Sequence, residues 1–97
     1  MARECGCDMR GMLSFLILFL LSKKPMHGQE LACEIGKRKG EKPSPGTIYP
    51  ALKALRENGL IREKGEGRTI TYELTADGKR GLAGAKRIFC QTFRDIL

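Results

Sequence analysis

The feature that most constrains the fold is a nearly unbroken apolar run at residues 12–21, in which Ser14 is the one polar residue. As a helix, a run of this length spans about 15 Å, half of a bilayer core, so it predicts a buried helix rather than a membrane span. A helix that is apolar all round must also be covered all round. We therefore expect a helix from Met9 or Arg10 to Ser22, covered by the chain's last helix, by the second subunit of a homodimer, or by both.

A helix with well-marked ends is predicted to follow in the middle of the chain. Ser44 is a favourable N-cap whose hydroxyl can accept from a free backbone N–H, and Pro45 suits the first helical position. Pro50 cannot donate to the carbonyl four residues earlier, so we expect a local irregularity there. Asn58-Gly59 ends the helix, since glycine suits the left-handed C′ position. The buried face is predicted from the i, i+4, i+7 spacing of Ile48, Leu52 and Leu55.

Two short strands are predicted directly after this helix. Residues 60–64 form the first, and residues 65–67, with two glycines, form a turn. Residues 68–74 alternate, which places Ile70, Tyr72 and Leu74 on one face of the second strand. A helix followed by a basic-edged hairpin is typical of a winged helix-turn-helix. The predicted fold class is therefore mainly α with a small β-hairpin (α+β).

Four motifs resemble the PadR-like family of transcriptional regulators. They are Met-His-Gly at residues 26–28, Ser-Pro-Gly-Thr-Ile-Tyr-Pro-Ala-Leu at 44–52, Glu-Asn-Gly-Leu-Ile at 57–61 and Tyr-Glu-Leu-Thr-Ala-Asp-Gly at 72–78. The resemblance spans roughly residues 13–79 and implies a dimeric DNA-binding regulator, usually a repressor. The chain differs at Gln29, where the family often has an aromatic residue that can stack or contact phosphate.

In this fold the third helix enters the major groove and the wing lies along the backbone or the minor groove. Hydroxyl groups at the start of the helix suit phosphate oxygens, and a lysine further along can reach a guanine edge. The resemblance implies contacts at Ser44, Thr47, Tyr49 and the wing. An alternative for Tyr49 is a half-buried aromatic that supports the wing. The full set of predicted DNA-binding residues is Ser44, Thr47, Tyr49, Lys53, Arg56, Lys64, Gly67 and Arg68.

The charge of the chain favours a polyanionic partner. It has 18 Lys+Arg against 11 Asp+Glu, a net charge of +7, with the excess concentrated between Lys23 and Arg68. Nucleic acid and an anionic membrane surface both fit such a charge. Because the excess overlaps the predicted third helix and wing, it favours double-stranded DNA. No nucleophile–base pair or phosphate-binding glycine loop is visible, and there is a single His. We therefore expect neither an enzyme nor a cofactor.

A further helix is predicted to start near His27-Gly28, with His27 in a capping or packing role. Leu31 and Ile35 face inward, with Ala32 and Cys33 as further candidates. Residues 36–43, rich in glycine and lysine, are predicted to be a link, solvated or in contact with phosphates.

The last helix begins at the N-cap Thr75, with Asp77 in its first turn. Apolar residues then recur at spacings of three and four, as in a coiled coil. We expect a loose segment at residues 1–8, a winged helix-turn-helix domain at 9–74 and a dimerisation helix at 75–97. The stripe is Leu82, Ala85, Phe89, Phe93 and Ile96, and the predicted dimer contacts are Phe15, Phe19, Leu82, Phe89, Phe93 and Ile96.

The cysteines leave one alternative open. Reduced thiols and a cytoplasmic location are expected, because nothing resembles a secretory signal. Cys5 and Cys7 are weak candidates for a soft metal or a redox pair, since their spacing differs from that of a structural zinc site. The alternatives to a plain DNA-binding regulator are a thiol-based metal or redox sensor with the same head, and a winged helix that binds proteins. The family resemblance also implies an unidentified small-molecule effector, because in some relatives an apolar ligand acts at the dimer interface.

Overall fold

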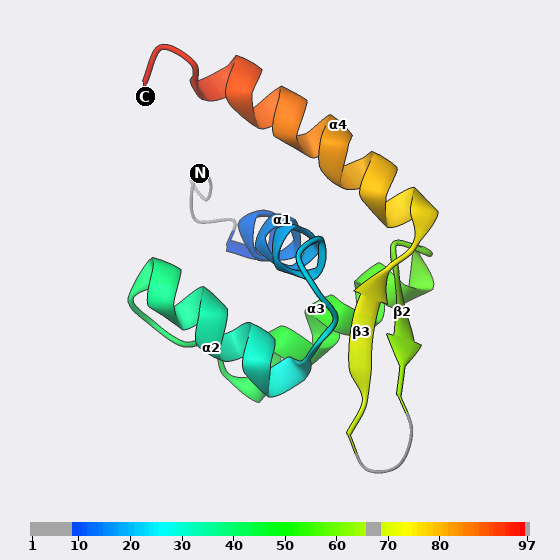
Figure 1. Ribbon diagram of the computed structural model, residues 1–97. Coiled ribbons are helices and arrows are strands. Elements are labelled where there is room, and N and C mark those ends of the chain that lie inside the picture. Colours follow the sequence, from blue (N-terminus) through cyan, green and yellow to red (C-terminus); the bar gives the residue numbers. More distant parts are fainter. Residues whose placement is uncertain (1–8, 66–68, 97) are drawn as a thin grey trace.

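The computed structural model describes residues 9–65 and 69–96, and the fold is a winged helix-turn-helix (Figure 1). It is mainly helical, as predicted, and its sheet is antiparallel and has three strands. No helix in these two ranges is long and apolar enough to cross a membrane. The elements are α1 (Met9–Leu21), β1 (Met26–His27), α2 (Gly28–Lys39), α3 (Pro45–Glu57), β2 (Ile61–Lys64), β3 (Thr71–Leu74) and α4 (Ala76–Phe93).

The sheet contains one strand more than the sequence predicted. Its order is β1-β3-β2, because Met26 pairs with Tyr72 while Ile61 pairs with Leu74. β1 has only two residues, too few for an alternating pattern to be visible. It pairs the segment between α1 and α2 with β3, the middle strand of the sheet.

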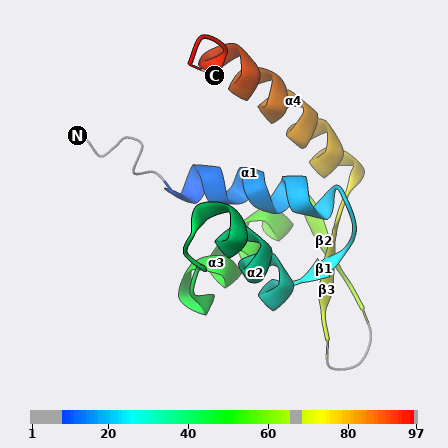
Figure 2. The same ribbon diagram turned by 60° about the vertical axis from the view of Figure 1, so that its left-hand side comes forward.

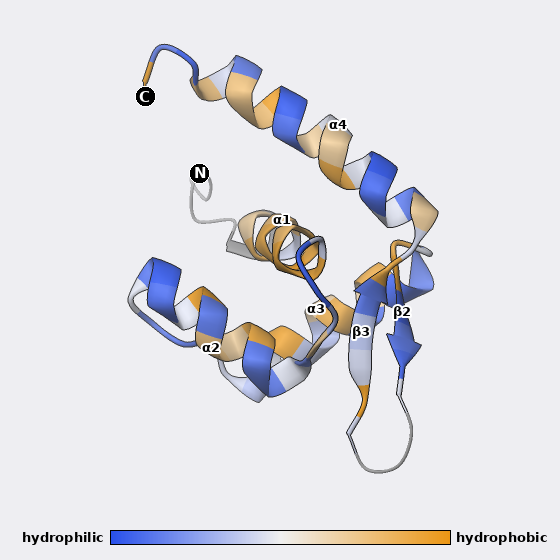
Figure 3. Cartoon of the chain, viewed as in Figure 1, coloured by the Kyte–Doolittle hydropathy of each residue, from blue (hydrophilic) through white to orange (hydrophobic). Residues whose placement is uncertain are grey.

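The apolar helix α1 lies at the centre of the fold. It contacts α2, α3, β3 and α4. Figure 2 shows it between α4 and the α2–α3 pair, and Figure 3 shows it mainly in orange, the colour of apolar residues. On the side of α4, the ring of Phe15 stacks on that of Phe89, with centroids 5.7 Å apart. The chain's own last helix therefore covers part of α1, which was one of the two expected covers. Met12 remains 49% exposed.

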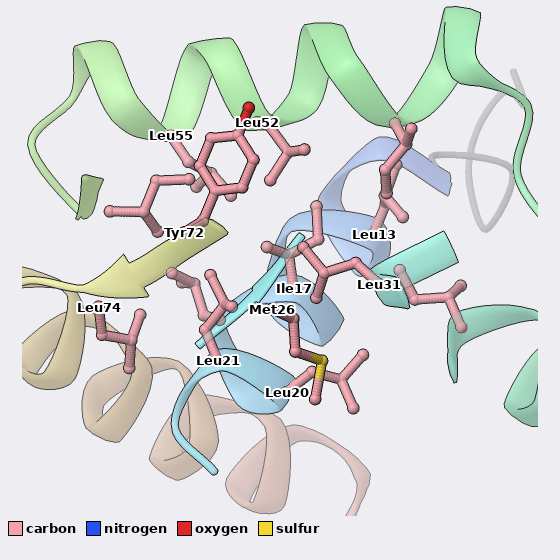
Figure 4. Close-up of a cluster of buried hydrophobic side chains, with 14 of the residues drawn as sticks. Leu13, Ile17, Leu20, Leu21, Met26, Leu31, Leu52, Leu55, Tyr72 and Leu74 are labelled. Atoms are coloured by element: carbon pink, nitrogen blue, oxygen red, sulfur yellow. The ribbon is translucent and has the colours of Figure 1, made fainter. Parts of the chain in front are cut away.

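The core forms between α1, α3 and the sheet (Figure 4). The predicted inner face of α3 is confirmed, because Ile48, Leu52 and Leu55 are all buried. Tyr72 and Leu74 are also buried, whereas Ile70, predicted on the same face of the strand, is 47% exposed. The strand begins at Thr71, three residues later than the predicted start at residue 68, so Ile70 lies before the strand.

α2 is longer than predicted. Leu31, Ile35 and Ala32 are buried, whereas Cys33 is exposed and is not a core residue. Residues 36–39, predicted as part of a link, form the last turn of the helix. The turn is stable because its basic side chains complement the helix dipole and because Gly40, at φ 85°, caps it by donating to the carbonyl of Gly36.

The start of α4 is docked onto the turn between α3 and β2. The Thr75 N–H donates to the carbonyl of Leu60 (3.1 Å), and the Thr75 hydroxyl donates to the carbonyl of Gly59 (2.5 Å). The same hydroxyl accepts from the N–H of Gly78 (3.0 Å), which confirms the predicted N-cap. The helix ends at Phe93, so Ile96 lies in the turn that follows it rather than on a helical stripe.

Gly78 and Gly84 provide a matched test of this docking. A Cβ on Gly78 would lie 2.0 Å from the carbonyl oxygen of Leu60, whereas a Cβ on Gly84 would have nothing within 4 Å. Alanine exceeds glycine in helix propensity by about 1 kcal/mol. Gly84→Ala should therefore raise the free energy of unfolding by up to about this amount. Gly78→Ala should lower it by about 1–3 kcal/mol, as overpacking does.

Urea denaturation followed by circular dichroism would measure both changes. Equal stabilisation by the two substitutions would show that α4 does not rest on the Leu60 carbonyl.

Candidate nucleic-acid interface

The polar start of α3 is exposed, as predicted, but its cap differs from the prediction. Ser44 has the extended backbone of an N-cap, and its carbonyl accepts from the N–H groups of Thr47 and Ile48 (both 2.9 Å). Its hydroxyl makes no capping bond to the backbone and lies 3.3 Å from the hydroxyl of Thr47. α3 runs as one continuous helix from Pro45 to Glu57 although it contains Pro50. The two hydroxyls therefore form one small polar pair at the exposed start of the helix.

The exposed side of α3 divides into two flanks. Thr47 lies beside a hollow that it shares with the end of α2 and the following link, including Lys42 and Pro43. Tyr49 and Arg56 are seven residues apart, so they lie two turns apart on the same flank, which faces the sheet. Lys53 is exposed between the flanks and has no ion-pair partner in the described ranges.

Tyr49 packs against the first residue of α2. A Cβ on Gly28 would lie 2.7 Å from both Cε1 and the hydroxyl oxygen of Tyr49, so only glycine leaves room for this ring position. The Tyr49 side chain is nonetheless 43% exposed and lines a hollow of about 440 Å³ between α2, α3 and β3. The outer end of the Tyr49 ring thus packs on α2 while the side chain as a whole stays partly exposed, and both predicted roles, a DNA contact and support of the wing, stay predictions. The other lining residues are His27, Gln29, Thr69, Ile70 and Tyr72.

Two of the predicted DNA-binding cations pair with carboxylates of the wing. Arg56 of α3 forms an ion pair with Glu63 of β2, and Lys64 lies 3.7 Å from Glu73 of β3. Arg62 also bonds Glu73, with Nε 2.6 Å from Oε2, and this bond, with Lys64, holds the pKa of the Glu73 carboxyl below its usual value. Arg56 therefore joins α3 to the sheet, a position that the sequence pattern did not predict.

His27 has the predicted capping position. Its Nδ1 accepts from the N–H of Glu30 (3.1 Å) at the start of α2. The Glu30 carboxylate lies 3.2 Å from the ammonium group of Lys24, which lowers the pKa of Glu30. Tyr72, assigned to the core from sequence, is buried, and burial raises the pKa of its phenol.

Some predicted residues lie outside the described residues. These are Gly67 and Arg68 of the wing, and Cys5 and Cys7 of the first segment. Among residues 9–65 and 69–96, no group of three or more His, Cys, Asp or Glu side chains could hold a metal ion.

Three residues next to Tyr49 were not predicted as part of the interface: His27, Gln29 and Thr69. His27 and Gln29 flank Gly28, which belongs to the Met-His-Gly motif. A glycine there indicates that a large side chain can pack closely against the backbone. No sequence pattern indicated Thr69, because its position beside Tyr49 depends on the tertiary fold.

The comparisons with known proteins agree with one another. The family model "Transcriptional regulator PadR-like family" matches residues 17–84. The transcriptional regulator YqjI of Escherichia coli (strain K12) is 42% identical over 76 residues, which cover 74% of this chain and 36% of YqjI. The chain therefore spans little more than a third of the length of that relative. The transcriptional regulator Rv3488 of Mycobacterium tuberculosis is 31% identical over 86 residues, covering 84% of this chain and 78% of Rv3488.

The structure of a transcriptional regulator from Clostridium thermocellum has a similar fold. Its TM-score is 0.80 at 27% identity, and the match covers 91% of this chain and 92% of that one. The same arrangement of helices and wing is thus found in a solved structure of nearly the same extent.

Gly28→Ala tests whether the contact with α2 positions Tyr49. The added methyl group overlaps the outer end of the Tyr49 ring, which is a movable side chain, so the ring should turn away while the fold persists. In two-dimensional NMR, the cross-peaks between the Tyr49 ring and residue 28 should weaken or vanish, with core signals unchanged. Gly46→Ala is the control, because the nearest atom to a Cβ there is 3.8 Å away. An unmoved Tyr49 ring in Gly28→Ala would contradict the described packing.

Proposed function

We propose that this chain, which belongs to the PadR-like family of transcriptional regulators, binds specific duplex DNA as a homodimer and represses transcription. Membership of the family makes the chain a transcriptional regulator and not an enzyme. The DNA-binding residues, the dimer and the repressor role are the proposal. The observation that supports it most directly is the exposed outer side of α3 beside the wing.

The outer side of α3 carries groups suited to each kind of contact with a duplex. The hydroxyls of Ser44 and Thr47 stand at the start of the helix, where donors to phosphate oxygens fix the register. Lys53 is exposed six residues after Thr47, where its ammonium group would reach a base edge in the major groove. Tyr49 lines the hollow between α2, α3 and β3, so it would contact the DNA backbone there.

The charges next to α3 shape this interaction. The carboxylates of Glu63 and Glu73 are each bound by arginine or lysine of α3 or the wing, so they present little free negative charge to DNA. Lys53 forms no ion pair with any described residue, so its ammonium group is available to phosphates and bases. Because each phosphate contact releases counterions, the affinity should fall steeply with salt.

The homodimer is proposed from the apolar residues that the chain leaves exposed. Phe89 is held between Phe15 and Phe93, with centroids 5.7 and 4.8 Å away, so the inner side of α4 is already used. Met12, Ile88, Phe93 and Ile96 remain 49%, 65%, 37% and 72% exposed. Exposed apolar patches of this kind are typical of protein interfaces. Because they lie on α1 and beyond the middle of α4, a second copy meeting them would leave both α3 helices free.

Two α3 helices related by a two-fold axis would read half-sites about one helical turn apart, about 34 Å. A repressor of this type acts by occupying a palindromic site. Leu82 is buried within its own chain, so we now expect it to support α4 rather than to contact the partner.

Substitution of α3 tests the reading helix. Tyr49→Phe and Lys53→Ala should each weaken binding to the specific duplex by about five- to tenfold, because each removes one charged or polar contact worth about 1–1.5 kcal/mol. Fluorescence anisotropy with a duplex from the region upstream of the protein's own coding sequence, and with a scrambled duplex, would measure this over a salt series. Arg80→Ala is the matched control, since Arg80 lies on α4 and pairs only with Asp77 in the described structure.

Unchanged affinity in both α3 variants would exclude α3 as the reading element. Absence of duplex binding at low salt would instead favour a winged helix that binds proteins.

Phe93→Asp tests the dimer. A charge in the proposed interface should shift the protein from dimer to monomer by at least about tenfold in dissociation constant, because an unpaired buried charge is costly. Analytical ultracentrifugation would measure the constant. Ile70→Asp is the control, since Ile70 has a similar exposure on the wing. A stable dimer in Phe93→Asp would remove the end of α4 from the interface.

A further inference from the structure

The ion pair between α3 and the wing brings a carboxylate into competition with DNA. Arg56 of α3 is predicted from sequence to bind DNA, yet its guanidinium is already bound by the carboxylate of Glu63 on β2. The two side chains are 44% and 40% exposed, so both remain accessible from outside the protein. A phosphate group would therefore compete with Glu63 for the same arginine.

The register of the wing places Glu63 on the inner face of the sheet. Side chains alternate along a strand, so Glu63 lies on the same face of β2 as the buried Ile61. In the ladder, Glu63 lies directly opposite the buried Tyr72, and residues opposite each other share a face. Burial raises the pKa of the Tyr72 phenol, and the Glu63 carboxylate raises it further. Glu63 is thus an acid on the face of the strand that otherwise covers the core.

The fold does not require an acid at this position. An exposed ion pair contributes little to stability, and a β-branched residue opposite Tyr72 would pack well on its ring. What the pair changes is the charge available to DNA. Of the two cations in α3, Lys53 and Arg56, only Lys53 has no ion-pair partner among the described residues. The position of Glu63 is therefore better explained by its effect on binding than by its effect on folding.

We propose that Glu63 is a specificity-determining residue, which keeps Arg56 from binding the phosphates of non-specific DNA. Binding to a duplex of any sequence rests mainly on phosphate contacts made by lysine and arginine. Holding Arg56 on the wing removes one such contact. The affinity for non-specific DNA is therefore lower than the number of cations on this side of the protein would otherwise give.

The specific complex is affected less by the pair. Contacts with phosphates and base edges hold that complex in one orientation. In this orientation Arg56 lies two turns beyond Tyr49, on the flank of α3 that faces the sheet, and stays paired with Glu63. Non-specific complexes sample many orientations, and in some of them a free Arg56 would reach a phosphate. This inference rests on the proposed function, because it assigns a role to one residue of the same interface.

Glu63→Gln tests the proposal, because it keeps the shape of the side chain and releases the guanidinium of Arg56. The affinity for the scrambled duplex should rise about three- to fivefold, the upper range for one exposed ion contact. The affinity for the upstream duplex should rise by less than about twofold. The plot of log affinity against log salt for the scrambled duplex should also become steeper by about 0.9, because one more phosphate contact releases counterions. Fluorescence anisotropy over a salt series would measure these changes.

Glu57→Gln is the matched control. It removes the same charge at the end of α3, where Glu57 forms no ion pair with any described residue. It should raise the affinity for both duplexes equally, and by less than about twofold. The double variant Arg56→Gln with Glu63→Gln should gain no more over Arg56→Gln than Glu57→Gln gains over the unmodified protein. Urea denaturation would show that each variant is folded.

Equal gains for the two duplexes in Glu63→Gln would overturn the proposal. A gain that persists in the double variant would also overturn it, since release of Arg56 would then not be the cause. Equal weak binding of both duplexes by the unmodified protein would instead contradict the proposed function. If neither duplex is bound, a heparin column replaces them as the polyanion, and elution of Glu63→Gln at the same salt as Glu57→Gln would show that Glu63 does not withhold Arg56.

Discussion

The burial of α1 is the constraint on which the other elements depend. Its apolar surface cannot be covered by one neighbour, so α2, α3, β3 and α4 must all contact it. This shared contact fixes the positions of the recognition helix and of α4 relative to each other, although they belong to different parts of the chain. The winged helix-turn-helix elements and α4 are therefore joined through a common core rather than through a linker.

The arrangement of the interface depends on a second set of contacts, between α3 and its neighbours. Gly28 admits the ring of Tyr49, and the Arg56–Glu63 ion pair joins α3 to β2. The exposed ion pair is worth little in free energy, but it spans two elements that must approach a duplex together. Two side chains predicted from sequence to contact DNA thus also hold α3 against its neighbours, Tyr49 against α2 and Arg56 against β2.

Much of this fold could be predicted from local patterns. The apolar run of α1, the spacing of Ile48, Leu52 and Leu55, and the cap at Thr75 each determine one element by themselves. β1 could not be predicted, because a two-residue strand exists only through its partner. The same holds for Ile70, for the ion pair of Arg56 and for the close approach of Gly78 to Leu60, since each depends on residues brought together by the tertiary fold. The hydroxyl of Ser44 had an obvious local role as a cap, and it bonds Thr47 instead.

The docking of Thr75 and Gly78 on residues 59 and 60 has a geometric consequence. α4 has 18 residues, so it is a rod about 27 Å long, and its hydrogen bonds to the rest of the fold are at its first end. A rotation of about 10° at this pivot would displace the far end by about 5 Å. In a dimer joined by the far ends, such a displacement would be about one seventh of the roughly 34 Å between successive major grooves. A small adjustment around the Leu60 carbonyl would therefore change the spacing of the two heads along the double helix.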